Sequence, residues 1–254
     1  MGRALIELVL SSADLELAGA VEAPGHPLVG RDAGELVGAP RGVRISSEIA
    51  DGDCLIDFTR PEATLGHLEQ CLRRGMRMVI GTTGFSAAQI ERIADGSKRI
   101  AIVQAPNMSP GVNLAFTLAE TAARTLGESY DVEIIEAHHR HKVDAPSGTA
   151  LRFGTVIARA LGRDFGHAAV HGRHGEVGER RAGAIGFHAV RGGDIVGEHT
   201  VMFAGEGERL EITVRSSSRA TYAGGALRAA RFLADKRNGL YDMHDVLGLK
   251  QRAG

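Results

Sequence analysis

Apolar residues follow two different patterns along the chain, and each predicts its own architecture. Up to about residue 107, short apolar runs alternate with stretches in which apolar residues recur every three or four positions, as in strands alternating with helices. Such alternation favours a parallel α/β sheet. The expected helices are 2–10, 62–74 and 86–94, and the expected strands are 15–22, 53–58, 77–84 and 100–107.

After Asn107 the pattern changes and predicts an α+β domain with a mainly antiparallel sheet. Gly192-Gly193 and Gly205–Gly207 interrupt the last three of its expected strands as hairpin turns would. Two helical segments, 222–233 and 241–249, close the chain and are expected to pack on the first region. The expected elements of this second region are helices at 113–126 and 150–161 and strands at 132–137, 183–191, 194–204 and 208–217.

Composition and charge exclude several classes of protein. The chain has 254 residues, 43% of them hydrophobic, enough for one large core or two modest ones. With 30 Lys and Arg against 31 Asp and Glu, and no long run of one sign, a nucleic-acid partner is not expected. No uncharged stretch approaches the roughly 20 apolar residues of a bilayer span, so no membrane partner is expected either. Two cysteines, Cys54 and Cys71, and the lack of a signal-peptide pattern predict a cytoplasmic protein.

Three loops that follow expected strands are candidate ligand sites, because open parallel sheets bind ligands beyond the carboxyl ends of their strands. They are 58–60, 81–83 and 105–108. Small residues at 81–83 would let a flat ring or a ribose approach the backbone, although the same GTTG sequence would also suit an ordinary turn. Glu22 ends the strand over 15–22, where a carboxylate can accept hydrogen bonds from ribose hydroxyls. The alternative for Glu22 is a solvated surface group.

The segment 131–149 is the strongest candidate for chemistry. Three histidines, an arginine and a lysine crowd into HHRHK, residues 138–142, between an expected strand and an expected helix. Ser147 is a good N-cap, and the amides of Gly148 and Thr149 would open a helix whose N-terminus attracts a carboxylate or phosphate. An anion site would then lie close to proton donors, including histidine, which titrates near neutral pH. A charged, solvated loop is the alternative.

The same three histidines raise the question of a zinc site. Adjacent His138 and His139 on a strand point to opposite faces, and neither HExxH nor paired CxxC spacing occurs. We therefore expect no metal. The other histidines of the second region lack ligand spacing and are interpreted as structural; they are His167, His171, His174, His188 and His199.

On these residues the chain resembles the dihydrodipicolinate (4-hydroxy-tetrahydrodipicolinate) reductase family of the diaminopimelate and lysine pathway. EIIEAHHRHKVDAPSGTA reproduces the family's signature, and IDFTRPE, VIGTTGF, RAGAIGFHAVRGGDIVGEHTVMF and GERLEITVRSSSR recur in family order. The resemblance runs from Met1 to about Leu249. It implies a Rossmann-like dinucleotide-binding domain over 1–108 and 220–254. It also implies a substrate-binding and oligomerisation domain over 109–219, through which family members form homotetramers.

The resemblance implies NAD(P)H-dependent reduction of 4-hydroxy-tetrahydrodipicolinate to tetrahydrodipicolinate, and it assigns roles to individual residues. His138 becomes the catalytic acid/base and Lys142 the proton donor. The substrate dicarboxylate is expected to bind His139, Gly148, Thr149 and Arg219. The residues expected to bind NADH or NADPH are Met1, Glu22 at the ribose, Arg60, Gly81, Thr82 and Thr83 beside the nicotinamide half, and Ala105, Pro106, Asn107 and Met108 at the hinge.

Two departures from the family pattern concern the cofactor. Family members open with an apolar strand and a loop like GAGGRMGR, of which only Met1 and Gly2 stand here. We therefore expect the first strand and most pyrophosphate-binding glycines to be missing. Ala23 follows Glu22 where some relatives carry an arginine suited to the NADP 2′-phosphate, which favours some preference for NADH.

Two rival functions remain open from the sequence. One is a catalytically inactive relative that binds a dicarboxylate or a protein partner through the second domain. The other is a metal-dependent hydrolase that uses the histidine cluster.

Overall fold

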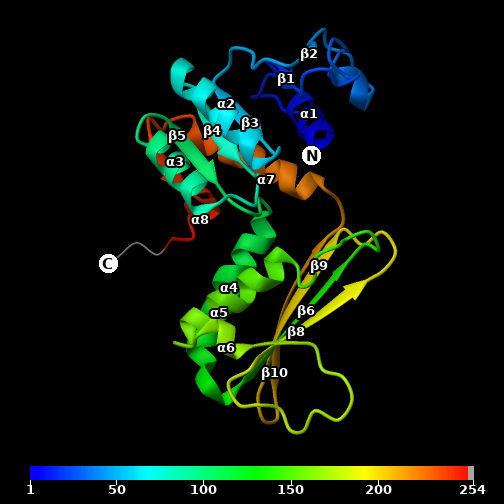
Figure 1. Ribbon diagram of the computed structural model, residues 1–254, viewed down its shortest axis with the longest axis vertical. Helices are drawn as coiled ribbons and strands as arrows, with labels where there is room; N and C mark the ends of the chain where they lie inside the picture. The colour runs from blue at the N-terminus through cyan, green and yellow to red at the C-terminus, as the bar shows by residue number, and fades with distance from the viewer. Residues whose placement is uncertain (251–254) are drawn as a thin grey trace. The chain divides into compact units, whose positions relative to one another are not determined.

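The computed structural model describes residues 1–250, and its chain divides into two compact units (Figure 1). Unit 1 consists of Met1–Pro110 and Arg219–Gly254, and unit 2 of Gly111–Ser218. Relative to the expected boundaries, unit 1 takes in two more residues before the first junction and one more at the second. The last four positions of the expected 220–254 segment lie outside the described residues.

Unit 1 contains a four-stranded sheet with the strand order β11-β5-β4-β3. All its strand pairs are parallel, as the alternation of strands and helices predicted. The elements of unit 1 are α1 (Gly2–Leu10), β1 (Ala20–Val21), η1 (Gly34–Val37), β2 (Ile45–Ser46), β3 (Cys54–Asp57), α2 (Pro61–Arg74), β4 (Arg77–Ile80), α3 (Ala87–Ser97), β5 (Ala101–Gln104), α7 (Ala220–Leu233), β11 (Gly239–Tyr241) and α8 (Met243–Leu247).

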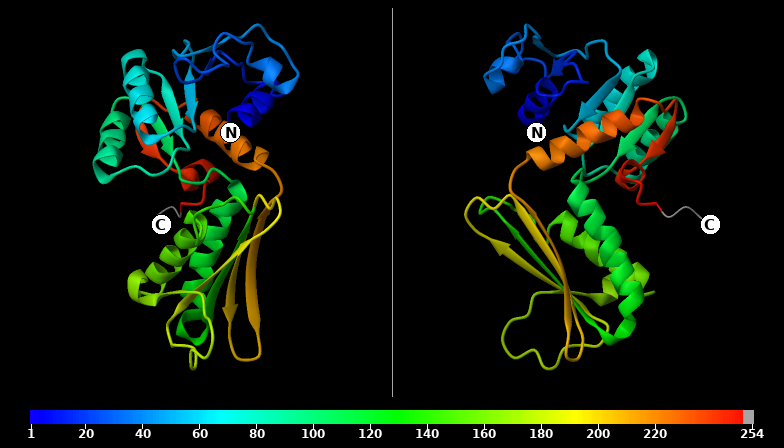
Figure 2. Two further views of the ribbon diagram at one scale, coloured as in Figure 1. Left: turned by 45° about the vertical axis from the view of Figure 1, so that its right-hand side comes forward. Right: turned by 180° about the vertical axis from the view of Figure 1, so that it is seen from behind.

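Helices cover both faces of this sheet (Figure 2). On one face Leu65, Leu68 and Ile93 of α2 and α3 pack with β4 and β5 side chains. On the other face Ala226, Ala229 and Leu233 of α7 pack with Val79 and Val103. The expected return of the C-terminal helices to the first region is therefore confirmed.

The strand expected over 15–22 is largely absent. Only Ala20 and Val21 form a strand, which pairs in parallel with β2 in a separate two-stranded sheet. The apolar residues Leu17 and Ala20 pack instead with Ile6 and Ile45 in a small core of their own. An apolar run without an adjacent long strand to pair with thus becomes mostly irregular backbone.

Unit 2 is a five-stranded sheet with the order β10-β9-β6-β8-β7, packed on helices α4 and α5 (Figure 2). Its elements are α4 (Pro110–Leu126), η2 (Gly127–Ser129), β6 (Asp131–His138), α5 (Gly148–Ala160), α6 (Phe165–Ala168), β7 (Ala169–His171), β8 (Ile185–Arg191), β9 (Gly197–Ala204) and β10 (Arg209–Ser216).

The sheet of unit 2 is mixed, with two antiparallel pairs that are at least as long as the two parallel ones. The hairpin expected at Gly205–Gly207 is present, because β9 and β10 pair antiparallel. The hairpin expected at Gly192-Gly193 was wrong. Strand β6 lies between β8 and β9, so this turn begins a crossover rather than a hairpin.

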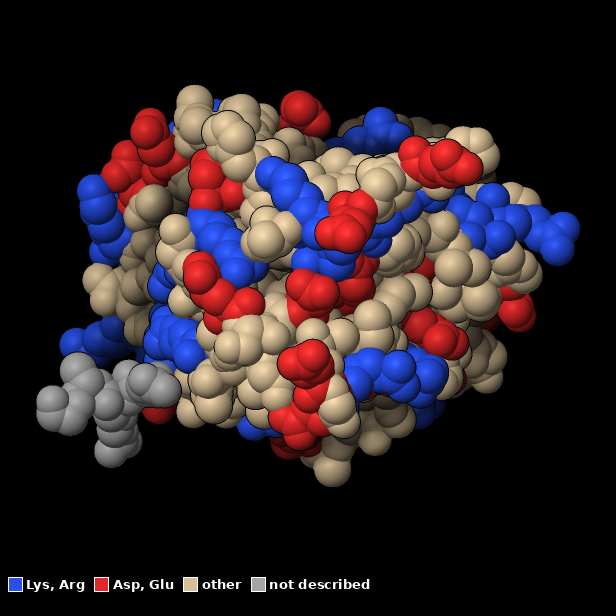
Figure 3. Space-filling view, turned by 90° about the horizontal axis from the view of Figure 1, so that it is seen from below, with Lys and Arg blue, Asp and Glu red and all other residues tan. Residues whose placement is uncertain are grey.

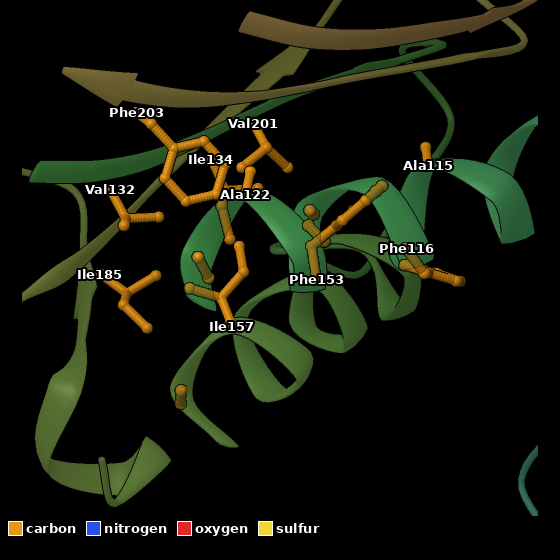
Figure 4. Close-up of a cluster of buried hydrophobic side chains, with 14 of the residues drawn as sticks. Ala115, Phe116, Ala122, Val132, Ile134, Phe153, Ile157, Ile185, Val201 and Phe203 are labelled. Atoms are coloured by element: carbon orange, nitrogen blue, oxygen red, sulfur yellow. The ribbon is translucent and has the colours of Figure 1, made fainter. Parts of the chain in front are cut away.

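The core of unit 2 lies between the sheet and α4 and α5 (Figure 4). Val132 and Ile134 of β6 face Phe153 and Ile157 of α5, and Phe203 of β9 closes the same layer. Since alternate residues of a strand share a face, the even-numbered residues of β6 all lie on this helix-covered side.

Charged side chains of both signs are interspersed on the face seen in Figure 3. Among residues 1–250, no helix is both long enough and apolar enough to cross a bilayer.

Candidate active site

Glu136 and His138 continue the helix-covered face of β6 beyond its apolar part. The residues before them on that face, Val132 and Ile134, belong to the core. The Glu136 side chain is fully buried, and that of His138 is 12% exposed. A carboxylate and an imidazole therefore stand side by side at the carboxyl end of a buried strand.

Hydrogen-bond donors surround both oxygens of Glu136. Arg191 of β8 donates through Nη1 to Oε2 and through Nη2 to Oε1, each at 2.7 Å. The backbone amide of Ser147 donates to Oε1 at 3.0 Å, and His138 Nδ1 lies 2.7 Å from Oε2. Burial alone would raise the pKa of Glu136, but the hydrogen bonds from Arg191, His138 and Ser147 together hold it below its usual value. Glu136 is therefore a carboxylate at neutral pH.

The ionised Glu136 determines which nitrogen of His138 carries a proton. A carboxylate only accepts, so His138 Nδ1 is the protonated nitrogen and Nε2 is left for chemistry. Burial lowers the pKa of His138, with Lys142 and Arg191 adding to the effect and Glu136 opposing it. The ring is therefore mostly neutral near pH 7.

Helix α5 begins beside this pair, and Ser147 is its N-cap, as expected. Ser147 Oγ accepts from the amide of Ala150 at 3.1 Å and lies 2.9 Å from Nε2 of His199. Gly148 and Thr149 open a helix of 13 residues, whose N-terminus favours negative charge. The predicted anion site and the predicted acid/base thus share one end of the sheet.

His199, interpreted as structural from the sequence, lies at this site. Its ring centroid is 5.1 Å from that of His138 in an edge-on arrangement. Burial, with a smaller contribution from His138, lowers its pKa to about 4. His199 is therefore a neutral hydrogen-bonding partner of Ser147 rather than a charged group.

The loop after β6 holds the two other basic candidates. Lys142 Nζ donates to Asp144 Oδ1 at 2.7 Å and to Oδ2 at 2.9 Å. The Lys142 amide donates to the His139 carbonyl at 3.1 Å. His139 Nδ1 is buried and has no hydrogen-bond partner within residues 1–250, as expected of a group whose partner is a ligand.

In unit 1 the candidate loops lie together along one edge of the sheet. Asp57 is in register with Ile80, and Ile80 with Gln104, so β3, β4 and β5 end at the same edge. The amide of Gly81 donates to the Asp57 carbonyl at 2.8 Å, and that of Ala105 to the Ile80 carbonyl at 3.1 Å. The loops predicted at 58–60, 81–83 and 105–108 are thereby adjacent.

Asp57 joins two of these loops through a buried polar network. Its Oδ1 accepts from the Thr59 amide at 2.8 Å and from Thr82 Oγ1 at 3.3 Å, and its Oδ2 is 2.7 Å from His67 Nδ1. Thr82 is 5% exposed and its hydroxyl also accepts from Thr64 Oγ1 at 2.9 Å. The Thr82 side chain is therefore committed to the protein, and exposed Thr83 is the hydroxyl that faces solvent.

The ring of Phe58 explains why residue 81 is a glycine. A Cβ built on Gly81 would lie 2.2 Å from Cε1 of the Phe58 ring. The absence of a side chain is therefore required by this packing, in addition to any approach of a ligand.

The remaining candidates lie in unit 1, most of them at element ends. Glu22 directly follows β1, and its Oε1 accepts from the Ala23 amide at 2.9 Å. Asn107 Oδ1 accepts from the Ser109 amide at 2.9 Å. Ala105 and Met108 are buried and Pro106 is exposed. The N-cap residues of α1, α2 and α7 are, in that order, Met1, Arg60 and Arg219.

Sequence reasoning missed Glu136 and Arg191 and assigned His199 no role at the site. Glu136 could have been found, because it stands two residues before His138 on the same strand face. Arg191 and His199 come from β8 and β9, and no spacing in the sequence indicates that these strands flank β6. Among residues 1–250, no group of three or more His, Cys, Asp or Glu side chains is placed to hold a metal ion.

Comparison with known proteins identifies the family of the chain. A family model described as dihydrodipicolinate reductase, N-terminus, matches residues 1–108, and one described as dihydrodipicolinate reductase, C-terminus, matches residues 111–247. The 4-hydroxy-tetrahydrodipicolinate reductase of Nitrosospira multiformis is 61% identical over 99% of this chain and 95% of its own length. That of Nitrosomonas europaea is 60% identical over 98% of this chain and 95% of its own length.

A solved structure, a dipicolinate-bound dihydrodipicolinate reductase from Paenisporosarcina sp. TG-14, resembles the fold with a TM-score of 0.75 and 25% identity. The similarity covers 96% of this chain and 94% of that one. Matching family models over both regions, close relatives over nearly the whole length and a similar solved structure agree with one another. The chain belongs to the dihydrodipicolinate reductase family.

Proposed function

We propose that this protein reduces 4-hydroxy-tetrahydrodipicolinate to tetrahydrodipicolinate with NADH or NADPH, in diaminopimelate and lysine biosynthesis. The observation that carries the proposal is the pairing of His138 with Glu136 beside the N-terminus of α5. It places an acid/base next to a site for carboxylates, as a cyclic dicarboxylate substrate requires.

Unit 2 supplies the substrate site. The N-terminal amides of α5 at Gly148 and Thr149 attract one substrate carboxylate. His139 Nδ1, which is buried without a partner within residues 1–250, is proposed to form a hydrogen bond with the substrate. Arg219, in unit 1, is the remaining candidate for the dicarboxylate.

The reaction removes the 4-hydroxyl as water and adds one hydride and one proton across the resulting carbon–carbon double bond. NADH or NADPH, when bound, supplies the hydride. His138 Nε2 and Lys142 exchange protons with the substrate, Lys142 after leaving its pairing with Asp144. The positive charge of Lys142 stabilises the electron-rich ring that precedes protonation.

Unit 1 has three features that suit a dinucleotide. Its parallel strands end at one edge, where ligands of such sheets bind. Gly81, which packs tightly on Phe58, presents no side chain that would block a flat ring. Glu22 follows β1 and has a second carboxylate oxygen available for ribose hydroxyls.

Location, assembly and cofactor preference are also part of the proposal. Two free cysteines fit a reducing cytoplasm. Unit 2 is proposed to form the homotetramer, and light scattering on the purified protein tests this. Preference for NADH rests on Ala23, and the ratio of kcat/KM for NADH and NADPH measures it.

The central test follows absorbance as NADH is oxidised, with substrate made in place by a coupled synthase. The double variant His138→Ala, Lys142→Ala is expected to lose at least about a hundredfold in kcat, the scale of general acid/base catalysis. The matched control, His167→Ala with Lys98→Ala, replaces the same residue types at exposed positions and should keep full activity.

Full activity of the active-site double variant would refute the proposed roles of His138 and Lys142. Dicarboxylate binding without any turnover by the unaltered protein would favour an inactive relative. Loss of turnover on chelation would favour the metal-dependent hydrolase.

A further inference from the structure

Two buried glutamates of β6 have nearly the same partners but lie on opposite faces of the sheet. Glu133 binds Arg173 through both oxygens, at 3.0 and 2.8 Å, and His188 Nε2 lies 2.7 Å from its Oε2. Glu136 binds Arg191 through both oxygens and has His138 Nδ1 at 2.7 Å. Only Glu136 lies next to the proposed substrate site, so only its partner His138 can exchange a proton with the substrate.

We propose that Glu136 is a positioning residue of the reaction, acting through His138 and through the N-terminus of α5. It holds His138 in the form with a proton on Nδ1 and with Nε2 available to the substrate. The inference rests on the acid/base role proposed for His138.

The first support is that Glu136 joins three elements of the site. Its own strand β6 carries His138, β8 carries Arg191, and α5 begins with Ser147, whose amide it binds at 3.0 Å. One rigid, fully buried carboxylate thus fixes the acid/base relative to the amides proposed to bind the substrate carboxylate. Catalytic groups depend on such support, because a displacement of about 1 Å can cost roughly a hundredfold in rate.

The second support is that the charge of Glu136 is itself protected. Arg191 donates to both oxygens and is anchored by a further hydrogen bond from Nη2 to the Asp144 carbonyl at 2.6 Å. A carboxylate in this arrangement stays ionised and can only accept. The neutral amide of glutamine would instead present donor hydrogens to His138 Nδ1 or to Arg191.

The third support comes from the groups that face His138. Glu136 is the acidic group that raises its pKa, while Lys142 on the following loop and Arg191 on β8 lower it. His199 of β9 is the remaining neighbour, and its low pKa keeps it neutral. Removing the charge of Glu136 therefore shifts the protonation of His138 to lower pH.

The test compares Glu136→Gln with Glu133→Gln in the full chain. The second variant removes an equally paired carboxylate on the other face and is the matched control. For Glu136→Gln we expect kcat to fall at least tenfold, with KM for NADH nearly unchanged. We also expect the acid limb of the pH profile of kcat, where protonation of His138 removes the active form, to move to lower pH. Glu133→Gln should leave the position of the profile unchanged, whatever it does to stability.

A measurement independent of activity uses ¹⁵N NMR of protein labelled at histidine, with the His138 signals assigned by their absence in His138→Asn. In the unaltered protein the neutral ring should carry its proton on Nδ1, and Glu136→Gln should change this. Glu136→Asp keeps the charge and should recover part of the lost kcat. Circular dichroism identifies any variant that does not fold.

Two results would overturn the inference. One is a ring of His138 protonated on Nε2 in the unaltered protein, a measurement that needs no variant to fold. The other is a folded Glu136→Gln protein with unchanged kcat and pH profile. Failure of the proposed function looks different, because the unaltered protein would then oxidise no NADH with this substrate. An active His138→Asn variant would refute the acid/base role of His138, whereas failure of this inference alone leaves His138→Asn inactive.

Discussion

At the scale of single residues, three part-buried histidine–carboxylate hydrogen bonds have different surroundings. His67 with Asp57, His188 with Glu133 and His138 with Glu136 each join a ring nitrogen to a carboxylate oxygen at 2.7 Å. Glu133 holds the loop that carries Arg173 and Arg180, Asp57 joins two loops proposed to bind the cofactor, and Glu136 contacts the proposed acid/base. The neighbours of a histidine–carboxylate pair, rather than the pair itself, therefore decide its role.

Glu133 makes the stability of unit 2 dependent on pH. Burial opposes its ionisation, but Arg173, His188 and Arg180 together lower its pKa from 4.5 to about 2. A carboxyl whose pKa is depressed by folding stabilises the fold above its unfolded pKa and loses that contribution as pH falls towards 2. The shift corresponds to about 3 kcal/mol of the free energy of unfolding at neutral pH.

Urea denaturation of the unaltered protein and of Glu133→Gln, from pH 7 to pH 2.5, measures this contribution. The two free energies of unfolding should converge as the pH falls. Curves that stay parallel over this range would contradict the assignment.

Gly81 is expected to tolerate no side chain. In Gly81→Ala the new Cβ meets the Phe58 ring, and overpacking of this kind costs roughly 1–3 kcal/mol. Because 81–83 is proposed to contact the cofactor, KM for NADH should also rise. Thermal denaturation and steady-state kinetics measure the two effects.

The control for Gly81 is Gly66, inside α2, where a Cβ would meet nothing within 4 Å. Gly66→Ala should stabilise the protein by up to about 1 kcal/mol, since alanine favours a helix, and leave KM unchanged. Equal effects of the two substitutions would argue against the role of Phe58.

At the scale of elements, the sequence predicted elements that depend on neighbouring residues and missed those that depend on pairing between distant segments. Helix α2 was predictable because Pro61 opens it, Gly75 caps it in the left-handed conformation and its apolar spacing is helical. Strand β11 was missed, since its three residues form a strand only by pairing with β5, which is distant in the sequence. The crossover from β8 to β9 was missed for the same reason: β6 separates them.

The cap of α5 has a second function that the cap of α3 lacks. Ser147→Ala removes the bond to the Ala150 amide and leaves buried His199 Nε2 without its partner. We expect a loss of roughly 1–3 kcal/mol in the free energy of unfolding. KM for the substrate should also rise, because the start of α5 is the proposed carboxylate site.

Ser86→Ala is the comparison, since Ser86 caps α3 through Gln89 and lies on the surface. It should cost about 1 kcal/mol or less and leave KM for the substrate unchanged. A rise in KM for Ser86→Ala as large as that for Ser147→Ala would mean that lost helix stability alone explains the effect.

At the scale of the whole molecule, the two units have separate cores and separate candidate sites. We therefore expect the two ligands to protect different segments from hydrogen exchange. NADH should slow exchange at 81–83 and 105–108, and dipicolinate should slow it at 138–149. Mass spectrometry of the exchanged protein, with each ligand alone, measures this. Protection of unit 1 alone by dipicolinate would refute the assignment of the substrate site to unit 2.

The sequence indicated the candidate residues that lie close together along the chain and missed those that lie on distant strands. His138, Lys142, His139, Gly148 and Thr149 lie within one short segment, so one local pattern indicated them together. Their supporting groups come from other strands. No pattern within a single segment indicates that Arg191 would reach Glu136, because that contact depends on the strand order of the sheet.

The discontinuity of unit 1 has a consequence for synthesis on the ribosome. The polypeptide is made from its N-terminus, so all of unit 2 is synthesised before α7, β11 and α8. Until β11 and α7 are made, one edge of β5 is unpaired and one apolar face of the parallel sheet is exposed to solvent. While unit 2 is synthesised, the exposed edge of β5 is therefore a template for wrong strand pairing. This interval is when the chain is most open to aggregation and has most to gain from a chaperone.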